Sequence, residues 1–541
     1  MQEEFQLTRQ GLGAIPIIDS VITRIGLFDH LSSAMKNDRY AEAIVLLVKN
    51  VMIERNALYA IQDWSAQFDP ELVYGGKHSD DALARALDRL FEIDRASLLT
   101  RIVVSAVKTH GVDLSQIHQD TTSVKVTGAY KRQKNKALKL ARGHSKDHRP
   151  DLKQLVYELS VTRDGAVPIL YKSHDGNRTD DTLHWDNWQT LRGVLGRSDF
   201  LYVADSKACV NKTMLNIDRN QGRFVSILPR TRDEAKQFNQ KVVASLARWE
   251  KVAARRSKKS GRIDLFEVVS GLHQTREGFR LFWFRSSEKA HRDWDGREER
   301  ISSAIAKLRS LGDPVRKKKS KKEKALRKKA LEIVSHFGVE DWVEVNIALE
   351  RVEKFRQARR GPATPDSMFR RTVQWVPTIS CHRNEAAIAK AEAMDGIFPL
   401  VTNTDLDAKA VLIAYKYQPT LERRHALLKS GLQVAPIFLK KNDRIEALMF
   451  VYFLAQLICA LIERQLRQAM QEHGLKQIQI LPEDRPSPTP TIEQVMRVFD
   501  TRARHILFSK TGKAVQRFCD PLTPIQAQLL DLLSVPTSAY L

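Results

Sequence analysis

Cysteine is scarce in this chain of 541 residues, and its placement excludes two kinds of stabilisation. The four cysteines are scattered and form no C-x-x-C pair: Cys209, Cys381, Cys459 and Cys519. A disulfide framework or a cysteine-based zinc site needs cysteines at regular, close spacings. We therefore expect reduced thiols in a cytoplasmic protein.

Long apolar runs are also missing. The most apolar stretch, 447–462, contains Gln456 and is flanked by charged residues, whereas a membrane-spanning helix needs about 20 apolar residues. This stretch therefore predicts a buried core helix. The N-terminus, MQEEFQLTRQ, is acidic and polar and does not resemble a signal peptide. No lipidation motif stands out, so we expect no membrane partner.

Acidic residues are outnumbered, with 64 Asp and Glu against 88 Lys and Arg. The net charge is +24 and the sequence pI is about 9.8. A surplus of this size is informative about partners, and the usual polyanionic partner of a basic protein is nucleic acid.

The chain is long enough for about three or four domains. Apolar residues at three- and four-residue steps predict an all-helical domain over 1–112, with Ser79 as a helix cap. Because this domain looks separate from the rest, we expect it to bind DNA. From 113 to 230 the pattern changes to strand, hairpin, helix, strand and strand, and Asp164-Gly165 marks the hairpin turn. This order indicates a mixed sheet covered by helices.

Three further segments follow. We expect an inserted domain of helices and strands over 231–395, a return to the sheet over 396–480, and a helical tail over 481–541 that begins with a Pro-rich linker. The insertion carries the basic run RKKKSKKEKALRKK at 316–329, which fits either a solvated helix or an arm on DNA. We find no internal repeat.

Two aspartates stand out because each ends or interrupts an apolar strand pattern. Asp120 lies in QIHQDTTSVKV and Asp205 ends LYVAD. A carboxylate there must be compensated for its desolvation, and carboxylates at neighbouring strand ends suit a divalent cation such as Mg²⁺. Taken singly, each is more simply explained as a surface or capping aspartate.

A third carboxylate changes that balance. The helix predicted from PTLERRHALLKSG begins at Pro419, ends at Gly431 and carries Glu422. Lys429 lies seven residues after Glu422, hence on the same helix face, and Arg423, Arg424 and His425 crowd around it. Such a density of cations beside one acid fits a site that handles phosphates, although Glu422 alone would pass for a solvated acid.

The pattern Tyr415-x2-Gln418-x3-Glu422-x6-Lys429 resembles the Y-x2-R-x3-E-x6-K signature of bacterial insertion-sequence transposases. The segments HQDTTSVKVTG, GNRTDD, VADSKACV and DGIFPLVTNTDL also look like this group, and the resemblance covers most of 10–530. Glutamine at 418 departs from the signature's arginine, and it can donate a hydrogen bond but adds no charge.

The resemblance implies a DDE enzyme: α/β, with a ribonuclease-H-like mixed-sheet catalytic core, an inserted α+β domain and an N-terminal all-α domain. Asp120, Asp205 and Glu422 would be its catalytic acids and would hold two Mg²⁺ ions, for which Mn²⁺ could substitute. The signature also implies that Tyr415, Gln418 and Lys429 contact the phosphates of the element's ends, while Lys429 could equally complement the dipole of its helix end.

Other basic residues are candidates for contacts with the DNA backbone. The segment 130–151 supplies Lys131, Arg132, Lys146 and Arg149, and Arg423 joins them from the Glu422 helix. His144 and His148 share a spacing that a metal could use, but no further ligand lies near them. Trp375 is expected in a core rather than stacked on a base.

These features predict a DNA transposase that binds terminal inverted repeats, cleaves with Mg²⁺ and transfers strands. The expected partner is double-stranded DNA, both element ends and target, bound by a homodimer in the bacterial cytoplasm at the nucleoid. Two alternatives remain: a structure-specific nuclease that does not join strands, and a catalytically inactive DNA-binding derivative.

Overall fold

The computed structural model describes residues 5–76, 78–128, 130, 137–143, 149–178, 183–243, 247–256, 261–269, 271, 273–312, 323–509 and 511–540. The chain forms two compact units. The first consists of 1–226, 402–405 and 410–541, and the second of 227–401 and 406–409. The second unit is therefore inserted between two parts of the first in the chain.

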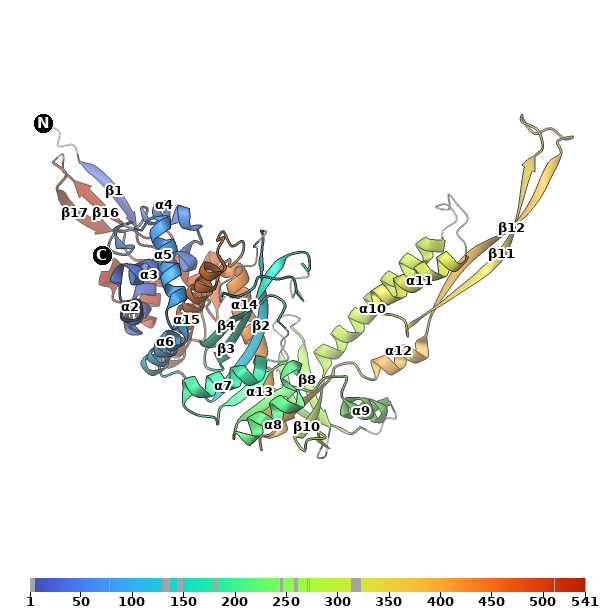
Figure 1. Ribbon diagram of the computed structural model, residues 1–541, viewed down its shortest axis with the longest axis horizontal. Coiled ribbons are helices and arrows are strands. Elements are labelled where there is room, and N and C mark those ends of the chain that lie inside the picture. The colour runs from blue at the N-terminus through green and yellow to red at the C-terminus, as the bar shows by residue number, and fades with distance from the viewer. Residues whose placement is uncertain are drawn as a thin grey trace. The chain divides into compact units, whose positions relative to one another are not determined.

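Strands β2 to β6 of the first unit lie in one mixed sheet, in the order β4-β3-β2-β5-β6 (Figure 1). Their bounds are β2 (Gln116–Val126), β3 (Lys153–Thr162), β4 (Pro168–His174), β5 (Leu201–Ala204) and β6 (Arg223–Ile227). β2, β3 and β4 pair antiparallel, whereas β5 runs parallel to both β2 and β6. The hairpin predicted at Asp164-Gly165 is confirmed, and the chain is of the mixed α/β class.

Helices cover both faces of this sheet. On one face, α7 (Leu183–Leu195) contacts β3 through Asn187 and Ser160. On the other lie α14 (Gln418–Ala426) and α15 (Asn442–Glu472), where Gln456 of α15 accepts a hydrogen bond from Tyr157 of β3. The remaining helices beside the strands are α8 (Asn211–Arg219) and α13 (Ala408–Tyr415).

Helix α15 is the long core helix that the apolar stretch predicts. Among the described residues it is the one helix long and apolar enough to cross a membrane, yet 94% of its most apolar window is buried inside the protein. Burying each large apolar side chain contributes about 1.5–3 kcal/mol. The prediction of a core helix is therefore confirmed.

Arg464 of α15 ties the sheet to the N-terminal helices. Its guanidinium donates to the backbone oxygens of His110 and Gly111 and pairs with Asp164 at 2.5 Å. A Cβ at Gly165, which has φ +74°, would lie 2.8 Å from the Arg464 Cβ. The turn therefore needs glycine both for its backbone conformation and for the close approach of α15.

The N-terminal segment is mostly helical, but it is neither all-helical nor separate. Its helices are α1 (Ile15–Arg24), α2 (Leu27–Met35), α3 (Asp38–Ile53), α4 (Ile61–Ser65), α5 (Asp80–Glu92) and α6 (Arg95–His110). Ser79 caps α5 as predicted. The strand β1 (Gln6–Gly11), however, pairs with β16 near the C-terminus, and Arg444 of α15 forms a bidentate ion pair with Asp88 of α5.

The C-terminal tail also differs from the helical prediction. It contains α16 (Ile492–Phe499) and α17 (Pro524–Leu532), but also β15 (Pro486–Ser487), β16 (Ala503–Phe508) and β17 (Ala514–Cys519). β15 pairs with β14 (Ile478–Gln479), which precedes the tail. β16 lies between β1 and β17 in a small antiparallel sheet. The chain ends therefore meet in one sheet, a pairing across the whole sequence that no local pattern reveals.

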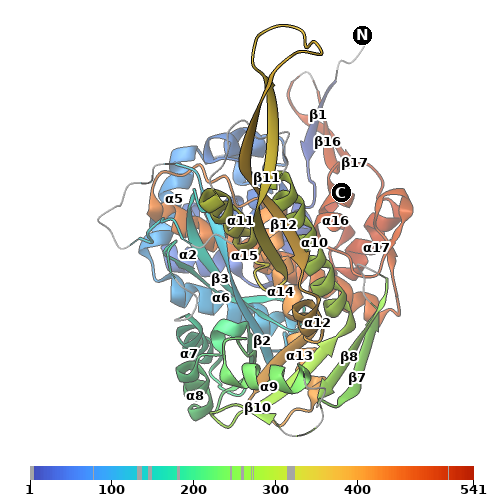
Figure 2. The same cartoon turned by 90° about the vertical axis from the view of Figure 1, so that its right-hand side faces the viewer.

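The second unit combines a sheet with a long hairpin (Figure 2). Its sheet strands follow the order β13-β10-β8-β7, and β9 pairs with β10: β7 (Trp249–Arg256), β8 (Ile263–Val269), β9 (His273–Gln274), β10 (Arg280–Ser286) and β13 (Ile397–Thr402). Its helices are α9 (Asp233–Val243), α10 (Ser287–Gly312), α11 (Glu323–Phe337) and α12 (Glu385–Glu392). The hairpin consists of β11 (Val343–Gln357) and β12 (Phe369–Arg383).

A separate apolar cluster holds the base of the hairpin. Ile301 and Leu308 of α10, Val334 of α11 and Ile388 of α12 are buried together with Val343 of β11. Beyond this cluster the hairpin continues with most side chains exposed. Trp375 is 63% exposed there, so its expected place in a core is wrong. The apolar and polar residues that alternate around Trp375 in the sequence belong to a strand whose two sides both face solvent.

Candidate active site

Asp120 and Asp205 stand at the same level on neighbouring strands. β2 and β5 pair in parallel as Gln116–Leu201, Ile117–Tyr202 and His118–Val203. Each aspartate comes two residues after the last of these pairs, where adjacent strands are about 4.8 Å apart. The sheet register therefore brings together two carboxylates that are distant in the sequence.

Helix α14 approaches the same part of β2. Its Gln418 accepts from His118 Nδ1 at 2.9 Å and donates to the backbone oxygen of Gln119 at 3.1 Å. Seven residues after Gln418 in the same helix, the Nε2 atom of His425 lies 3.8 Å from Oδ2 of Asp120. Glu422 lies four residues after Gln418 and three before His425 in the same helix, and its side chain is exposed.

The ionisation of Tyr415 shows that the three acids share one region. Burial, followed by the negative charges of Asp205, Glu422 and Asp120, raises the pKa of the Tyr415 hydroxyl to about 12. Charges act on a group in this way only from nearby. Asp120, Asp205 and Glu422 are therefore all within electrostatic reach of Tyr415, whose hydroxyl stays protonated and able to donate at physiological pH.

His118 is a neutral buried histidine. Burial lowers the pKa of its imidazole to about 4. Its Nε2 lies 2.8 Å from the Gln116 amide nitrogen, which can only donate, so Nε2 accepts and Nδ1 carries the proton given to Gln418. An uncharged amide suits this position, which provides a physical reason for glutamine where the signature has arginine.

Asp205 is held by a histidine that the sequence reasoning missed. His184 of α7 lies 3.5 Å from Asp205 Oδ1, and its other ring nitrogen meets the Tyr202 hydroxyl at 3.1 Å. Burial favours a higher pKa for Asp205, but His184 and the hydrogen bond from Lys207 N outweigh it, so the pKa lies below its ordinary value. The signal available in the sequence was only a histidine in the motif DDTLHW.

The three acids do not form a tight metal cage in the present arrangement. Among the described residues, no three His, Cys, Asp or Glu side chains lie close enough together to hold a metal ion. Asp120 accepts from Thr121 N at 2.7 Å and Asp205 from Lys207 N at 3.0 Å. The donor types suit Mg²⁺, which binds a few carboxylates together with water and phosphate oxygens.

The helix predicted from PTLERRHALLKSG is confirmed as α14, but it ends in a wide π-turn at Leu427–Gly431. Lys429 lies in this turn, which changes the helical spacing on which its expected alignment with Glu422 depended. Glu422 and Arg423 are exposed. Arg424 is instead buried, pairing with Glu463 at 2.9 Å and donating to the backbone oxygens of Gly165 and Ala166.

Three of the four DNA contacts expected at 130–151 lie outside the described residues: Lys131, Arg132 and Lys146. The histidines considered for a metal, His144 and His148, also lie outside them. Arg149 is exposed and forms a bidentate ion pair with Asp151, at 2.8 and 2.7 Å. Of the basic run at 316–329, positions 323–329 form the start of α11.

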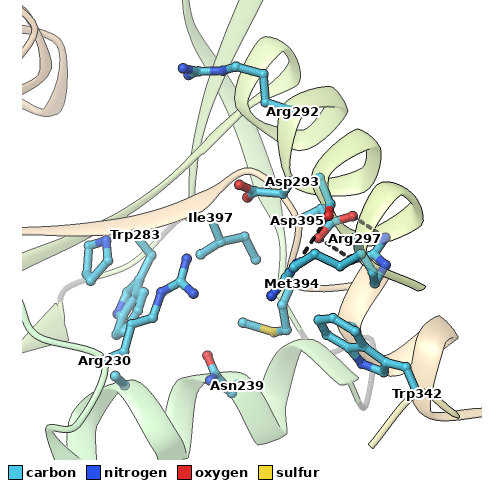
Figure 3. A pocket seen from close by; sticks show the side chains of 15 residues that line it. Arg230, Asn239, Trp283, Arg292, Asp293, Arg297, Trp342, Met394, Asp395 and Ile397 are labelled. Carbon is cyan, nitrogen blue, oxygen red and sulfur yellow. Dashed lines mark hydrogen bonds and ion pairs between the residues drawn. The ribbon is translucent and has the colours of Figure 1, made fainter. Parts of the chain in front are cut away.

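The second unit has a polar cavity of about 380 Å³ (Figure 3). Trp283 forms part of its wall and stacks on Phe238, with ring centroids 3.9 Å apart. Arg297 is neutralised there by Asp395 at 2.7 Å, whereas the Arg230 guanidinium points into the cavity. The cavity therefore presents a cation beside an aromatic wall, within a unit that does not contain the three acids.

Comparisons with known proteins add little. No family model and no curated protein matches this sequence. Among solved structures, a cryo-EM structure of a piggyBac transposase synaptic complex with hairpin DNA is similar over 91% of this chain and 81% of that chain. The identity is 8% and the TM-score 0.40. At these values the likeness defines neither the fold nor the function of this chain.

Proposed function

We propose that this chain is a DNA transposase that cleaves DNA and transfers strands by metal-dependent phosphoryl transfer. The observation that supports this most is the parallel register of β2 and β5, which brings Asp120 and Asp205 to the same level beside α14, the helix that carries Glu422. These are the three positions at which the signature of insertion-sequence transposases has its acids. Carboxylates gathered in a protein of net charge +24 suit chemistry on a polyanion.

The strand order supports a ribonuclease-H-like core. The first three strands of the sheet pair antiparallel, and the fourth runs parallel between the first and the fifth. This order places Asp120, within the first strand, at the same level as Asp205, directly after the fourth. The third acid comes from α14, which follows the second unit in the chain.

Asp120, Asp205 and Glu422 would hold two Mg²⁺ ions, with Mn²⁺ as a possible substitute. Bound there, the ions would activate a water or 3′-hydroxyl nucleophile and stabilise the leaving oxygen of an in-line displacement at phosphorus. His184 keeps Asp205 ionised by lowering its pKa, and an ionised carboxylate is the form that a cation needs.

Nearby side chains would position the DNA. The Tyr415 hydroxyl remains a donor because its pKa is about 12, and exposed Arg423 offers a guanidinium beside Glu422. Lys429 would neutralise a phosphate. We assign Gln418 a positioning role through its bonds with β2. The substrate would be double-stranded DNA, both element ends and target, bound by a homodimer at the bacterial nucleoid.

A structure-specific nuclease is the second candidate, since the same acids would cut DNA without joining it. The test is an assay with Mg²⁺ on duplexes that carry the DNA flanking the gene. A transposase gives both nicked and joined products, whereas cuts without joined product favour the nuclease. Asp120→Asn should abolish both products. Cleavage unchanged in that variant would mean that the acids are assigned wrongly, and no cleavage by the native chain would favour an inactive DNA-binding derivative.

A further inference from the structure

The distal half of the β11–β12 hairpin is a two-stranded ribbon with a different chemistry on each side. Figures 1 and 2 show β11 and β12 as a long two-stranded hairpin, and beyond the apolar cluster at its base nearly all side chains from Arg351 to Trp375 are exposed. An isolated two-stranded hairpin is marginally stable in water. A ribbon of this length therefore gains stability from whatever it binds.

The register assigns its side chains to two faces, because residues paired across antiparallel strands point to the same side. Phe355 pairs with Arg371, Glu353 with Val373 and Arg351 with Trp375. Glu353 forms ion pairs with both arginines of this side. This face therefore combines apolar side chains with two arginines that share the single carboxylate of Glu353.

The opposite side, which we call the basic face, carries Lys354, Arg356 and Arg370. Arg356 lies directly across from Arg370, and Lys354 is two residues along from Arg356. Like charges directly opposite one another destabilise a strand pair. In the described part of the chain these three cations have no ion-pair partner. The turn of the ribbon adds Arg359 and Arg360, both exposed.

We propose that the basic face of the β11–β12 ribbon binds duplex DNA, with the ribbon lying in the major groove. A groove about 12 Å wide admits a two-stranded β-ribbon, whose strands are about 4.8 Å apart. The negative phosphates of DNA relieve the repulsion between Arg356 and Arg370. A second copy of this chain, which is itself basic, does not. This inference rests on the proposed function, because it takes DNA as the substrate.

The test compares salt dependence of DNA binding. Lys354→Gln, Arg356→Gln and Arg370→Gln are combined in one full-length variant and measured on a short duplex of mixed sequence between about 50 and 200 mM salt. Each lost phosphate contact lowers the slope of log affinity against log salt by about 0.9, so we expect a fall of about 2 to 3 and a loss of about tenfold or more in affinity.

The matched control removes three charges from exposed positions elsewhere, through Lys212→Gln, Arg219→Gln and Lys476→Gln. It should lose clearly less of the slope, because these positions include no two cations directly opposite one another, as Arg356 and Arg370 are. Equal slopes in the two variants, or an unchanged slope in the ribbon variant, would overturn the proposal. Circular dichroism should show that the ribbon variant stays folded, since it relieves a repulsion.

Proteolysis separates DNA from a second copy of the chain as the occupant. Trypsin should cleave after Arg359 or Arg360 in the free protein, and duplex DNA should protect these bonds. A compound that occupies the major groove of the duplex should displace the ribbon and restore cleavage. Protection that rises with protein concentration in the absence of DNA would instead make the ribbon an interface between copies. A native chain that binds through the ribbon but never cleaves DNA would refute the proposed function while leaving the ribbon's role intact.

Discussion

Asp120 and Asp205 lie side by side because β2 and β5 pair in parallel with His118 opposite Val203, two residues before each aspartate. Neither aspartate is exceptional by itself. The parallel pairing brings a carboxylate within β2 and one directly after β5 into one site, and α14 contacts β2 there through Gln418 and His425. The properties of the site therefore depend on neighbours that orient and ionise the acids.

His184 should set the pH range over which Asp205 works. In His184→Phe, burial remains while the hydrogen bond is lost, so the pKa of Asp205 rises. Asp205 then becomes protonated at a higher pH. The acidic limb of the DNA-cleavage profile should therefore move to higher pH, and the variant should lose less activity at alkaline pH than at acidic pH. The profile is measured as rate against pH at saturating Mg²⁺.

Tyr202→Phe serves as a graded companion to that variant, because it removes only the hydroxyl that contacts His184. Tyr202→Phe should shift the acidic limb in the same direction as His184→Phe, but by a smaller amount. A uniform loss of rate at every pH in His184→Phe would show that His184 acts by packing alone.

Gln418 should resist replacement by the arginine of the transposase signature. In Gln418→Arg, the His118 Nδ1–H loses its acceptor and faces a guanidinium that can only donate. An unsatisfied buried donor costs about 1–3 kcal/mol, so the melting temperature should fall by about 2–4 °C. Gln471→Arg, on the exposed end of α15, is the matched control and should leave it unchanged. Tighter DNA binding at unchanged stability would mean that position 418 faces DNA.

His118 should make the first unit sensitive to acid. Its pKa is about 4 in the folded chain and about 6.5 when unfolded, so between these values the unfolded state binds more protons. The effect is absent above pH 6.5 and grows as the pH falls, reaching about 2 kcal/mol at pH 5. Denaturant titrations at pH 7 and pH 5 should therefore differ less in His118→Gln than in the native chain. Exposed His291→Gln should keep the native difference, and an equal difference in both variants would contradict the prediction.

The sequence predicts those parts of the molecule that local patterns determine. LYVAD and QIHQDTTSVKV are strands, Asp164-Gly165 is a hairpin turn and 447–462 is a core helix. Contacts between distant residues were not predictable: Gln6 pairs with Phe508, and Gln418 bonds His118 across 300 positions. The spacing of Lys429 also misled, because the π-turn after α14 breaks the regular helical repeat.

Gly165 should be required for the junction between the sheet and α15. In Gly165→Ala the new Cβ meets Arg464 Cβ at 2.8 Å and must adopt φ +74°, so the hairpin or the helix has to shift. The backbone strain and the overlap together should lower the free energy of unfolding by about 2–4 kcal/mol. Gly193→Ala, inside α7 with nothing within 4 Å of its Cβ, is the matched control and should stabilise by about 0.5–1 kcal/mol. Denaturant titration measures both. If Gly165→Ala and Gly193→Ala have the same free energy of unfolding, the close approach of Arg464 to Gly165 does not hold the hairpin in place. The hydrogen bonds of Arg464 with His110 and Gly111 would then not depend on that approach.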